Sequence, residues 1–600
     1  MNYTELKTQT NRGWNTWNVR SLLSYSHLPE GFTINLCIKH YEDAGVLREA
    51  LIGPQNIFPG TRSYDGSCTQ MNLKYKSLEL DIRTVVEDDQ QIILITPLKF
   101  GNFKKPNLII EACQLWGKEG CIGKKNGRLY GQYEDRTFEI FTSAPIVDLP
   151  HTFSLSPNIA VALEEPVVVS SRPCTVEEAE ALYTRAKAKL NEQNAVFGPH
   201  AEAYSAMKSC LAWDTIYECE HDRICSPVAR TWCLSSGGYV LFDWDTYFAA
   251  LLASPESREL AMLNAIAITD EVTPEGFVPN FGTAFGRKSF DRSQPPVGSH
   301  VCLEIYKRYP ETWFVEHVFP ILLSWNRWFS EKRSTEEGYL CWGSDTFEPI
   351  FGEHFELFGV HDRQGAAYES GLDNSPMYDG MVFDESRNIM LLADVGLMGL
   401  HIMDCRSLIE LAKIIGREDV IPEITARKER TEAALMTLWD EDYGMFLNKD
   451  LRDGSLSRRI SPTNFYALNA DSVTEEQKRR MIDEHFYNPD EFWGEFIMPS
   501  IARNDPAYPD QDYWRGRIWA PMNYLAYAAM KHAGLRKACA DLAEKSEALI
   551  LKEWRLHGHV HENYSGDDGL GCNKPNSDPF YHWGGLLAYI AIDNEQARKE

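Results

Sequence analysis

The sequence predicts a multidomain protein that combines an N-terminal antiparallel β-sandwich with an (α/α)6 barrel. Three observations lead to this prediction. The chain has 600 residues, more than one ordinary domain needs and enough for a large core. Apolar and polar residues alternate in short segments before residue 172, and helical periodicity dominates afterwards. Loops rich in Gly, Pro, Asp and Trp join the helices, as in a closed ring of helical hairpins.

Residues 1–172 are expected to form the sandwich domain. Turn-forming residues at 87–90 and 125–127 lie between the alternating segments, which favours an antiparallel arrangement. The alternation is clearest in three segments: 32–38, 78–86 and 137–141.

A linker helix is expected over residues 173–200, where Thr175 and Glu178 resemble a capping box. The barrel should then occupy residues 201–600. A complete ring needs about twelve helices, slightly more than the pattern reveals. The helical segments are 201–217, 244–253, 256–269, 298–308, 311–332, 388–416, 421–439, 474–484, 518–533 and 535–554.

Composition excludes several classes of function. The net charge of -27 argues against nucleic acid and against an anionic membrane surface as partners. The 14 cysteines contain no CxxC pair or zinc-type spacing, and no apolar run is long enough to span a membrane. We therefore expect a cytoplasmic protein that acts on a small molecule without a cofactor or metal, and the sequence leaves a homo-oligomer open.

Aromatic residues make up 12% of the chain and include 16 Trp. Large cores use aromatic residues, but flat rings also suit the C–H faces of sugars. Composition alone leaves both interpretations open.

Two acids stand in similar loop settings. Asp373 lies in the segment ESGLDNS, and Glu562 lies in HENYS. Glycoside hydrolysis needs one acid to protonate the leaving oxygen and one base to activate water, and these loops could supply them. Taken singly, Asp373 also fits an Asx-turn or a helix cap, and Glu562 also fits a surface loop.

Further segments carry side chains suited to sugars. In the segment FDWDTYF, one of Asp243 and Asp245 should cap a helix, while the other could bind hydroxyl groups. Gln294 offers both donors and acceptors. Arg515 could hold a hydroxyl group or a substrate carboxylate, orient a catalytic acid, or form an internal salt bridge. His582 lies beside Trp583 and Gly584, a setting that suits a pocket wall.

The order of these segments resembles a known family. WDTYF, SQPP, SGLDNS, YWRGRIWAP, HENYSG and YHWGG follow one another between residues 230 and 590. This arrangement is similar to glycoside hydrolase family 63 and, more distantly, to the trehalases of family 37. The family's G-x-D-N acid matches Asp373, and its E-N-Y base matches Glu562. The resemblance implies an inverting mechanism, an (α/α)6 barrel, and an α-glucoside or related small oligosaccharide as substrate.

Two alternatives stay open. Tyr581, His582 and Arg515 would also suit a carbohydrate lyase, and Arg515 with Arg517 could favour an anionic glycoside such as glucosylglycerate or mannosylglycerate. Trp14 and Trp17 could reach over the pocket as a lid. The expected substrate-binding residues are Trp244, Asp245, Phe248, Gln294, Asn374, Trp514, Arg515, Trp519, His582 and Trp583.

Overall fold

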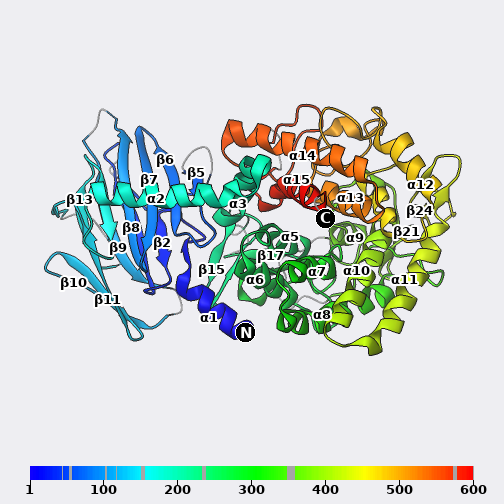
Figure 1. The fold of residues 1–600 in the computed structure, drawn as a ribbon, viewed down its shortest axis with the longest axis horizontal. Helices are drawn as coiled ribbons and strands as arrows, with labels where there is room; N and C mark the ends of the chain where they lie inside the picture. Colours follow the sequence, from blue (N-terminus) through cyan, green and yellow to red (C-terminus); the bar gives the residue numbers. More distant parts are fainter. Residues whose placement is uncertain are drawn as a thin grey trace. The chain divides into compact units, whose positions relative to one another are not determined.

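The computed structural model divides the chain into two compact units, Met1–Tyr239 and Val240–Glu600 (Figure 1). It describes residues 1–42, 45–52, 57–101, 104–115, 118–149, 154, 156–230, 232, 238–347, 359–571 and 577–598.

The N-terminal unit contains two large antiparallel sheets and a small one formed by β15 (Ile216–Glu218) and β16 (Arg223–Cys225). The first has the order β1-β2-β3-β9-β13, with β4 paired to β3, and the second has the order β10-β11-β12-β14-β8-β7-β6-β5. The antiparallel β-region expected from the alternating segments is confirmed. The strands of the two large sheets are β1 (Asn15–Trp17), β2 (Ser24–His27), β3 (Phe32–Lys39), β4 (Val46–Leu47), β5 (Ile57–Arg62), β6 (Cys68–Tyr75), β7 (Leu78–Glu87), β8 (Gln90–Lys99), β9 (Asn107–Gln114), β10 (Gly120–Lys125), β11 (Arg128–Tyr133), β12 (Arg136–Thr142), β13 (Asn158–Ala162) and β14 (Val167–Ser170).

The residues at the turns explain why two hairpins form. Asp88 and Asp89 join β7 to β8 with φ of 49° and 59°, and Asn126 and Gly127 join β10 to β11 with φ of 51° and 74°. Left-handed conformations at both central positions match the twist of the strands, and Asp, Asn and Gly adopt them most easily.

A short helix precedes the sheets and was not expected. α1 (Tyr3–Gly13) is capped by Asn2 and Glu5 and buries only Leu6 and Thr10. So few buried positions leave almost no apolar stripe in the sequence. Trp14 and Trp17 follow it and are both buried, and their lid role stays a prediction.

Helix α2 (Val176–Ala195) begins where the sequence predicted. The Thr175 hydroxyl accepts a hydrogen bond from the Glu178 amide at 3.2 Å, but the Glu178 carboxylate bonds Arg172 at 2.8 Å. The capping box is therefore only half formed. Both α2 and α3 (Ala201–Asp214) belong to the N-terminal unit, whereas residue 201 was the expected start of the barrel domain.

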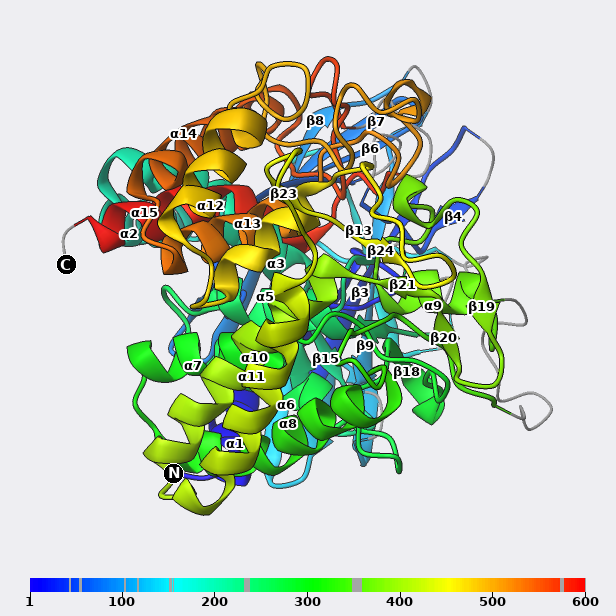
Figure 2. The same cartoon turned by 90° about the vertical axis from the view of Figure 1, so that its right-hand side faces the viewer.

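The C-terminal unit is mainly helical, as expected. Helix α5 packs on α6, α7 on α8, α10 on α11, and α14 on α15. Figure 2 shows α10 and α11 running side by side. The helices are α5 (Asp243–Ala253), α6 (Arg258–Thr269), α7 (Gly298–Arg308), α8 (Thr312–Lys332), α9 (Arg363–Glu369), α10 (Val395–Ile414), α11 (Ile421–Met436), α12 (Glu475–Arg480), α13 (Ala520–His532), α14 (Arg536–His557) and α15 (Leu586–Ala597).

The helix expected over 388–416 was predicted too long. Ile389–Met390 and Leu392–Ala393 form short strands β20 and β21, and α10 begins at Val395. The Asp394 carboxylate accepts a hydrogen bond from the Leu397 amide at 2.8 Å and so caps the helix. A short apolar run such as 389–393 is compatible with a strand and with a buried helix. The sequence pattern therefore could not locate the start of α10.

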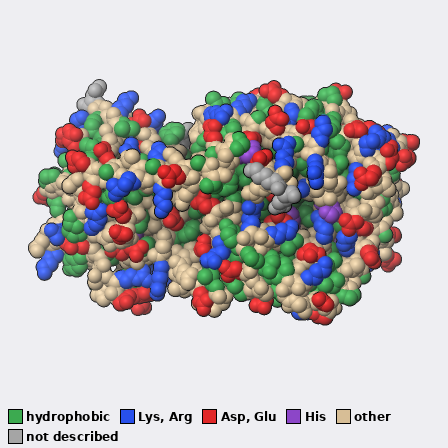
Figure 3. All heavy atoms as spheres, viewed as in Figure 1, with side chains coloured by type: hydrophobic (Ala, Val, Ile, Leu, Met, Phe, Trp, Pro, Cys, Tyr) green, Lys and Arg blue, Asp and Glu red, His purple; other side chains and the backbone are tan. Residues whose placement is uncertain are grey.

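On the face drawn in Figure 3, acidic and basic side chains are interspersed. Within the described part of the chain, no helix is both long and apolar enough to cross a membrane.

Candidate active site

Asp373 lies on a tight turn that follows α9. Gly371 adopts φ of +70°, and a Cβ added there would lie 2.7 Å from the Trp244 ring. Both the backbone conformation and the close ring therefore require glycine. Asp373 is half-buried, and its carbonyl accepts a hydrogen bond from Gln364 at 2.8 Å.

The loop that carries Tyr513 is bound to this turn. Asn374 Oδ1 accepts a hydrogen bond from the Trp514 amide at 2.9 Å, and its Nδ2 donates to the Asp512 carbonyl at 3.2 Å. Gln511 and Tyr513 both have positive φ, of 44° and 55°. An aromatic residue in the left-handed region is uncommon and occurs mainly where the surroundings enforce it.

The loop that carries Glu562 is bound to the same segment. Ile518 and Tyr564 exchange backbone hydrogen bonds of 2.7 and 3.0 Å, and the Gly566 amide donates to Gln511 Oε1 at 2.9 Å. Three segments that are far apart in the sequence therefore form one connected structure. They carry Asp373, Tyr513 and Glu562.

Glu562 is buried and hydrogen-bonded at both oxygens. Oε1 accepts from the Tyr513 hydroxyl at 3.1 Å, and Oε2 accepts from the Asp578 amide at 2.9 Å. Burial raises the pKa of Glu562 to about 8, and the Asp578 charge adds to this rise, although both hydrogen bonds oppose it. A carboxyl whose pKa lies near neutrality suits proton transfer.

Tyr513 is hydrogen-bonded to Glu562 and lies within the electrostatic influence of two further carboxylates. Burial raises its pKa, and the charges of Glu562, Asp373 and Asp245 raise it further. Such effects decline with distance, so Asp373 and Asp245 belong to the same charged neighbourhood as Glu562. Tyr513 was not among the expected site residues, because its motif does not reveal a left-handed backbone.

Asp245 is also buried and accepts a 2.7 Å hydrogen bond from the Tyr581 hydroxyl. Burial raises its pKa to about 7. The expectation that Asp243 or Asp245 caps α5 is wrong, because Phe242 occupies the N-cap position and no side chain caps the helix. The side chain of Asp243 points into the interior, where burial raises its pKa.

Five of the expected aromatic residues are buried together. Trp514 stacks on Trp519, with their ring centres 3.5 Å apart and their planes inclined by 10°. The Trp583 ring lies edge-on to both. Trp244 contacts Phe248, Trp514 and Trp583. Because these rings cover one another, stacking on a sugar would require neighbouring groups to move.

The other expected residues differ in surroundings. The Gln294 side chain is buried, and its Oε1 has no hydrogen-bond partner among the described residues. His582 is fully buried, and burial lowers its pKa to about 3, so its ring is neutral. Arg515 forms ion pairs with Asp379 at 3.1 Å and Asp510 at 2.8 Å, as in the internal salt-bridge alternative.

Arg517 is more deeply buried than Arg515. Its Nη1 donates to Asn563 Oδ1 at 3.0 Å and its Nε donates to the Gln511 carbonyl at 2.8 Å. It therefore supports the residue that follows Glu562. The sequence suggested that this cation could favour an anionic glycoside, but it did not predict the contact with Asn563.

A small cavity lies beside the Asp373 turn. Its walls include Trp244, Ser370, Leu372 and Asp394, and its volume is about 10 Å³. This volume holds about one water molecule, so the cavity is too small for a sugar ring.

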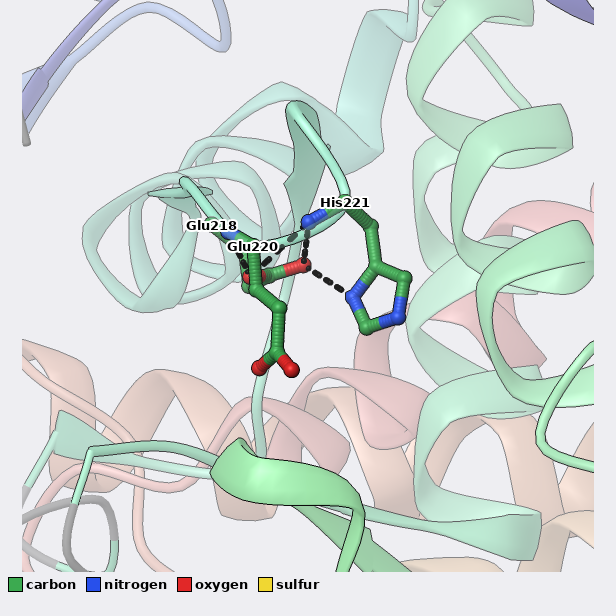
Figure 4. A group of neighbouring side chains, drawn as sticks. All are labelled: Glu218, Glu220 and His221. Carbon is green, nitrogen blue, oxygen red and sulfur yellow. Dashed lines mark hydrogen bonds and ion pairs between the residues drawn. The ribbon is translucent and has the colours of Figure 1, made fainter. Parts of the chain in front are cut away.

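One group among the described residues has the spacing of a metal site, and it lies in the N-terminal unit. The ligand atoms of Glu218, Glu220 and His221 lie within 4.8 Å of one another (Figure 4). However, the Glu218 carboxylate already accepts hydrogen bonds from His221 Nδ1 at 2.8 Å and Arg223 Nε at 3.1 Å. These hydrogen bonds occupy the Glu218 carboxylate and stabilise the turn after β15 (Ile216–Glu218). The group therefore does not indicate a metal site.

Buried carboxylates on loops of a helical unit, beside clustered Trp and Tyr rings, are typical of glycoside hydrolases. Residues 238–583 match the family model described as "Mannosylglycerate hydrolase MGH1-like glycoside hydrolase domain". This match spans more than half of the chain, and the chain belongs to this family of glycoside hydrolases. The resemblance to family 63 is thereby confirmed, and membership favours hydrolysis over the lyase alternative.

The chain is similar to curated enzymes at low identity. It is 23% identical to a mannosylglycerate hydrolase of Thermus thermophilus, over 52% of this chain and 85% of that enzyme. It is 23% identical to the mannosylglycerate hydrolase of Rubrobacter radiotolerans, over 59% and 90%. It is 22% identical to the mannosyl-oligosaccharide glucosidase of Saccharomyces cerevisiae, over 46% of this chain and 35% of that enzyme. A crystal structure of a family 63 mannosylglycerate hydrolase from Thermus thermophilus with glucose superimposes with a TM-score of 0.48 at 21% identity, covering 58% of this chain and 92% of that one.

Proposed function

We propose that this glycoside hydrolase is an inverting α-glycosidase acting on an α-linked glucoside or a related small oligosaccharide. Asp373 is the general acid and Glu562 is the general base. One observation carries the proposal: Asn374, next to Asp373, is hydrogen-bonded to the loop whose Tyr513 hydroxyl donates to Glu562, although 189 residues separate the two acids in the sequence. Inversion needs one carboxyl on each side of the sugar, and two separate loops can supply them.

Two hydrogen bonds favour the ionised form of Glu562 that a base requires, and they act against the burial that raises its pKa to about 8. The Tyr513 hydroxyl and the Asp578 amide both donate to it, which orients the carboxylate while leaving lone pairs for a water molecule. In its ionised form, Glu562 takes a proton from that water as the oxygen attacks the anomeric carbon. Asp373 meanwhile gives its proton to the departing glycosidic oxygen.

The product anomer tests the mechanism. The protein is incubated with a panel of α-linked disaccharides and aryl α-glycosides, and the first-formed anomer is followed by NMR. Inversion yields the β-anomer. Initial release of the α-anomer would contradict the proposal. A crystal structure should then place the two carboxyl groups roughly 6.5–9.5 Å apart, whereas about 5 Å would indicate retention.

The relatives favour a second substrate class. Two of them are named mannosylglycerate hydrolases, so mannosylglycerate and glucosylglycerate belong in the same panel. A glycerate carboxylate needs a cation, and Arg515 is already paired with Asp379 and Asp510. A higher kcat/KM for glycerate glycosides than for neutral disaccharides would favour this alternative.

We also propose that the helices of the C-terminal unit close into an (α/α)6 barrel. The pairwise packing of α5 with α6, α7 with α8 and α10 with α11 supports this arrangement, because such a ring is built from helical hairpins. An experimental structure with an open helical array would contradict it.

A further inference from the structure

A fully buried ion pair lies at the base of the Asp373 turn. Arg333 is the C-cap residue of α8, directly after Lys332, and Glu369 is the last residue of α9. Arg333 Nε donates to Glu369 Oε2 at 2.7 Å, and Nη2 donates to Oε1 at 2.9 Å. Neither side chain has exposed surface. This two-point geometry fixes direction as well as distance, which a single contact does not.

The same carboxylate binds two further segments. Glu369 Oε1 accepts from the Ser293 amide at 3.1 Å, and Oε2 accepts from the Gly343 amide at 2.6 Å. Four donors therefore fill the lone-pair positions of one carboxylate. Ser293 is the neighbour of Gln294, the expected sugar-binding residue.

Arg333 also contacts several partners. Its Nη1 donates to Asp345 Oδ1 at 3.0 Å, and its guanidinium lies 4.4 Å from the centre of the Trp328 ring. Both members of the pair are thus surrounded by partners, so neither can swing to a new position without breaking several contacts.

The turn between Glu369 and Asp373 has little freedom. The Gly371 amide donates to the Tyr368 carbonyl at 3.0 Å, and the Leu372 amide donates to Ser370 Oγ at 3.1 Å. Gly371 also rests against Trp244. A displacement of Glu369 would therefore be transmitted to Asp373, four residues further on.

Stability alone does not account for such a pair. Desolvation offsets much of the attraction between buried charges, and well-packed apolar residues often serve as well or better. The placement of this pair between two loops of the site suggests a role in geometry.

We propose that Glu369 and Arg333 are positioning residues that hold Asp373 and Gln294 at a fixed separation. This inference rests on the proposed function, in which Asp373 protonates the leaving group and Gln294 binds the sugar. Small displacements of a reacting group can cost about 100-fold in rate. A defect in the position of Asp373 should matter most where the leaving group needs a proton.

The test compares two substrates in two variants, Glu369→Gln and Arg333→Lys. The first removes the charge with little change in shape, and the second keeps the charge but loses the planar fork. We expect kcat for an α-linked disaccharide to fall about 10- to 100-fold. Turnover of the matching α-glycosyl fluoride should fall less than about 3-fold, because fluoride leaves without an acid. KM for both substrates should rise as Gln294 shifts.

Glu491→Gln is the matched control. Glu491 is also a buried carboxylate, bound by His485 at 2.7 Å and Tyr443 at 3.2 Å, but these partners lie outside the site. This variant reports the effect of destabilisation alone, which lowers both activities in proportion to the folded fraction. The folded fraction of each variant is measured by circular dichroism.

Equal losses on both substrates, or no loss, in the folded Glu369→Gln and Arg333→Lys proteins would overturn the inference. If only one of the two variants folds, its activities on the two substrates decide whether the inference holds. Asp373→Asn separates this failure from a failure of the proposed function. If Asp373→Asn shows no selective loss on the disaccharide, the assignment of the acid is wrong. If it does, while the Glu369 and Arg333 variants do not, only the positioning role is wrong.

Discussion

The Tyr513 hydroxyl donates a 3.1 Å hydrogen bond to Glu562 Oε1 from a residue whose φ is +55°. The left-handed backbone turns the ring toward the carboxylate, and Trp519 holds it there, with its ring edge-on at 4.9 Å and its Nε1 donating to the Tyr513 carbonyl at 3.0 Å. Strained backbone of this kind persists where the surroundings enforce it, often at functional sites.

Tyr513→Phe should lower kcat/KM about 10-fold near neutral pH, the size expected for a hydrogen bond to a charged group. The hydroxyl favours the ionised form of Glu562, so its removal raises the pKa of that carboxyl further. If Glu562 is the base, kcat/KM increases as pH rises through its pKa, and this limb should move to higher pH in the variant. Tyr487→Phe, which removes a hydroxyl bonded to Asp541, is the control and should leave the profile unchanged.

Asp373→Asn and Glu562→Gln should both fold, since each replacement is nearly isosteric. Loss of general acid or base assistance lowers the rate by about 10²–10⁴. An α-glycosyl fluoride should partly rescue Asp373→Asn, because its leaving group needs no proton. It should not rescue Glu562→Gln, since the water still needs activation. Rescue of Glu562→Gln alone would show that the two roles are reversed, an outcome that the raised pKa of Glu562 makes worth testing.

Glu562→Gln should stabilise the protein at alkaline pH. The pKa of Glu562 rises from its ordinary 4.5 to about 8 on folding, chiefly through burial. Between these values the folded protein keeps a proton that the unfolded chain releases, so the free energy of unfolding falls as pH rises. Glutamine removes this penalty. Thermal denaturation should therefore show a gain in Tm over the parent at about pH 8.5 and little difference at about pH 5. Equal Tm differences at both pH values would contradict the raised pKa.

Gly371→Ala should cost both stability and activity, with Gly380→Ala as its control. Both glycines have left-handed φ, of 70° and 74°, so both substitutions introduce roughly 1–2 kcal/mol of backbone strain. Only at Gly371 would the new Cβ lie 2.7 Å from the Trp244 ring, whereas no atom lies within 4 Å at Gly380. Urea denaturation should show the larger loss at Gly371, and only that variant should lose turnover. Equal effects would mean that the turn adapts to the methyl group.

Short sequence patterns correctly predicted many of the turns, strands and helices. The Asp-Asp and Asn-Gly turns, the Thr175 cap of α2 and the apolar periodicity of α7 and α8 all depend on residues close in the chain. The failures have the same origin. Helix α1 buries too few residues to form a visible stripe, and 389–393 fits a strand or a helix equally well.

The sequence by itself determined the chemical character of this protein: its β-rich and helical regions, its acidic balance, and the motifs that carry Asp373 and Glu562. Only the tertiary structure decided which side chains meet. Asn374 bonds Trp514 across 140 residues, Tyr513 bonds Glu562 across 49, and Arg333 bonds Glu369 across 36. Such contacts depend on how the whole chain packs, and no local propensity encodes them. Burial, which raises the pKa of Glu562, likewise exists only once that packing is complete.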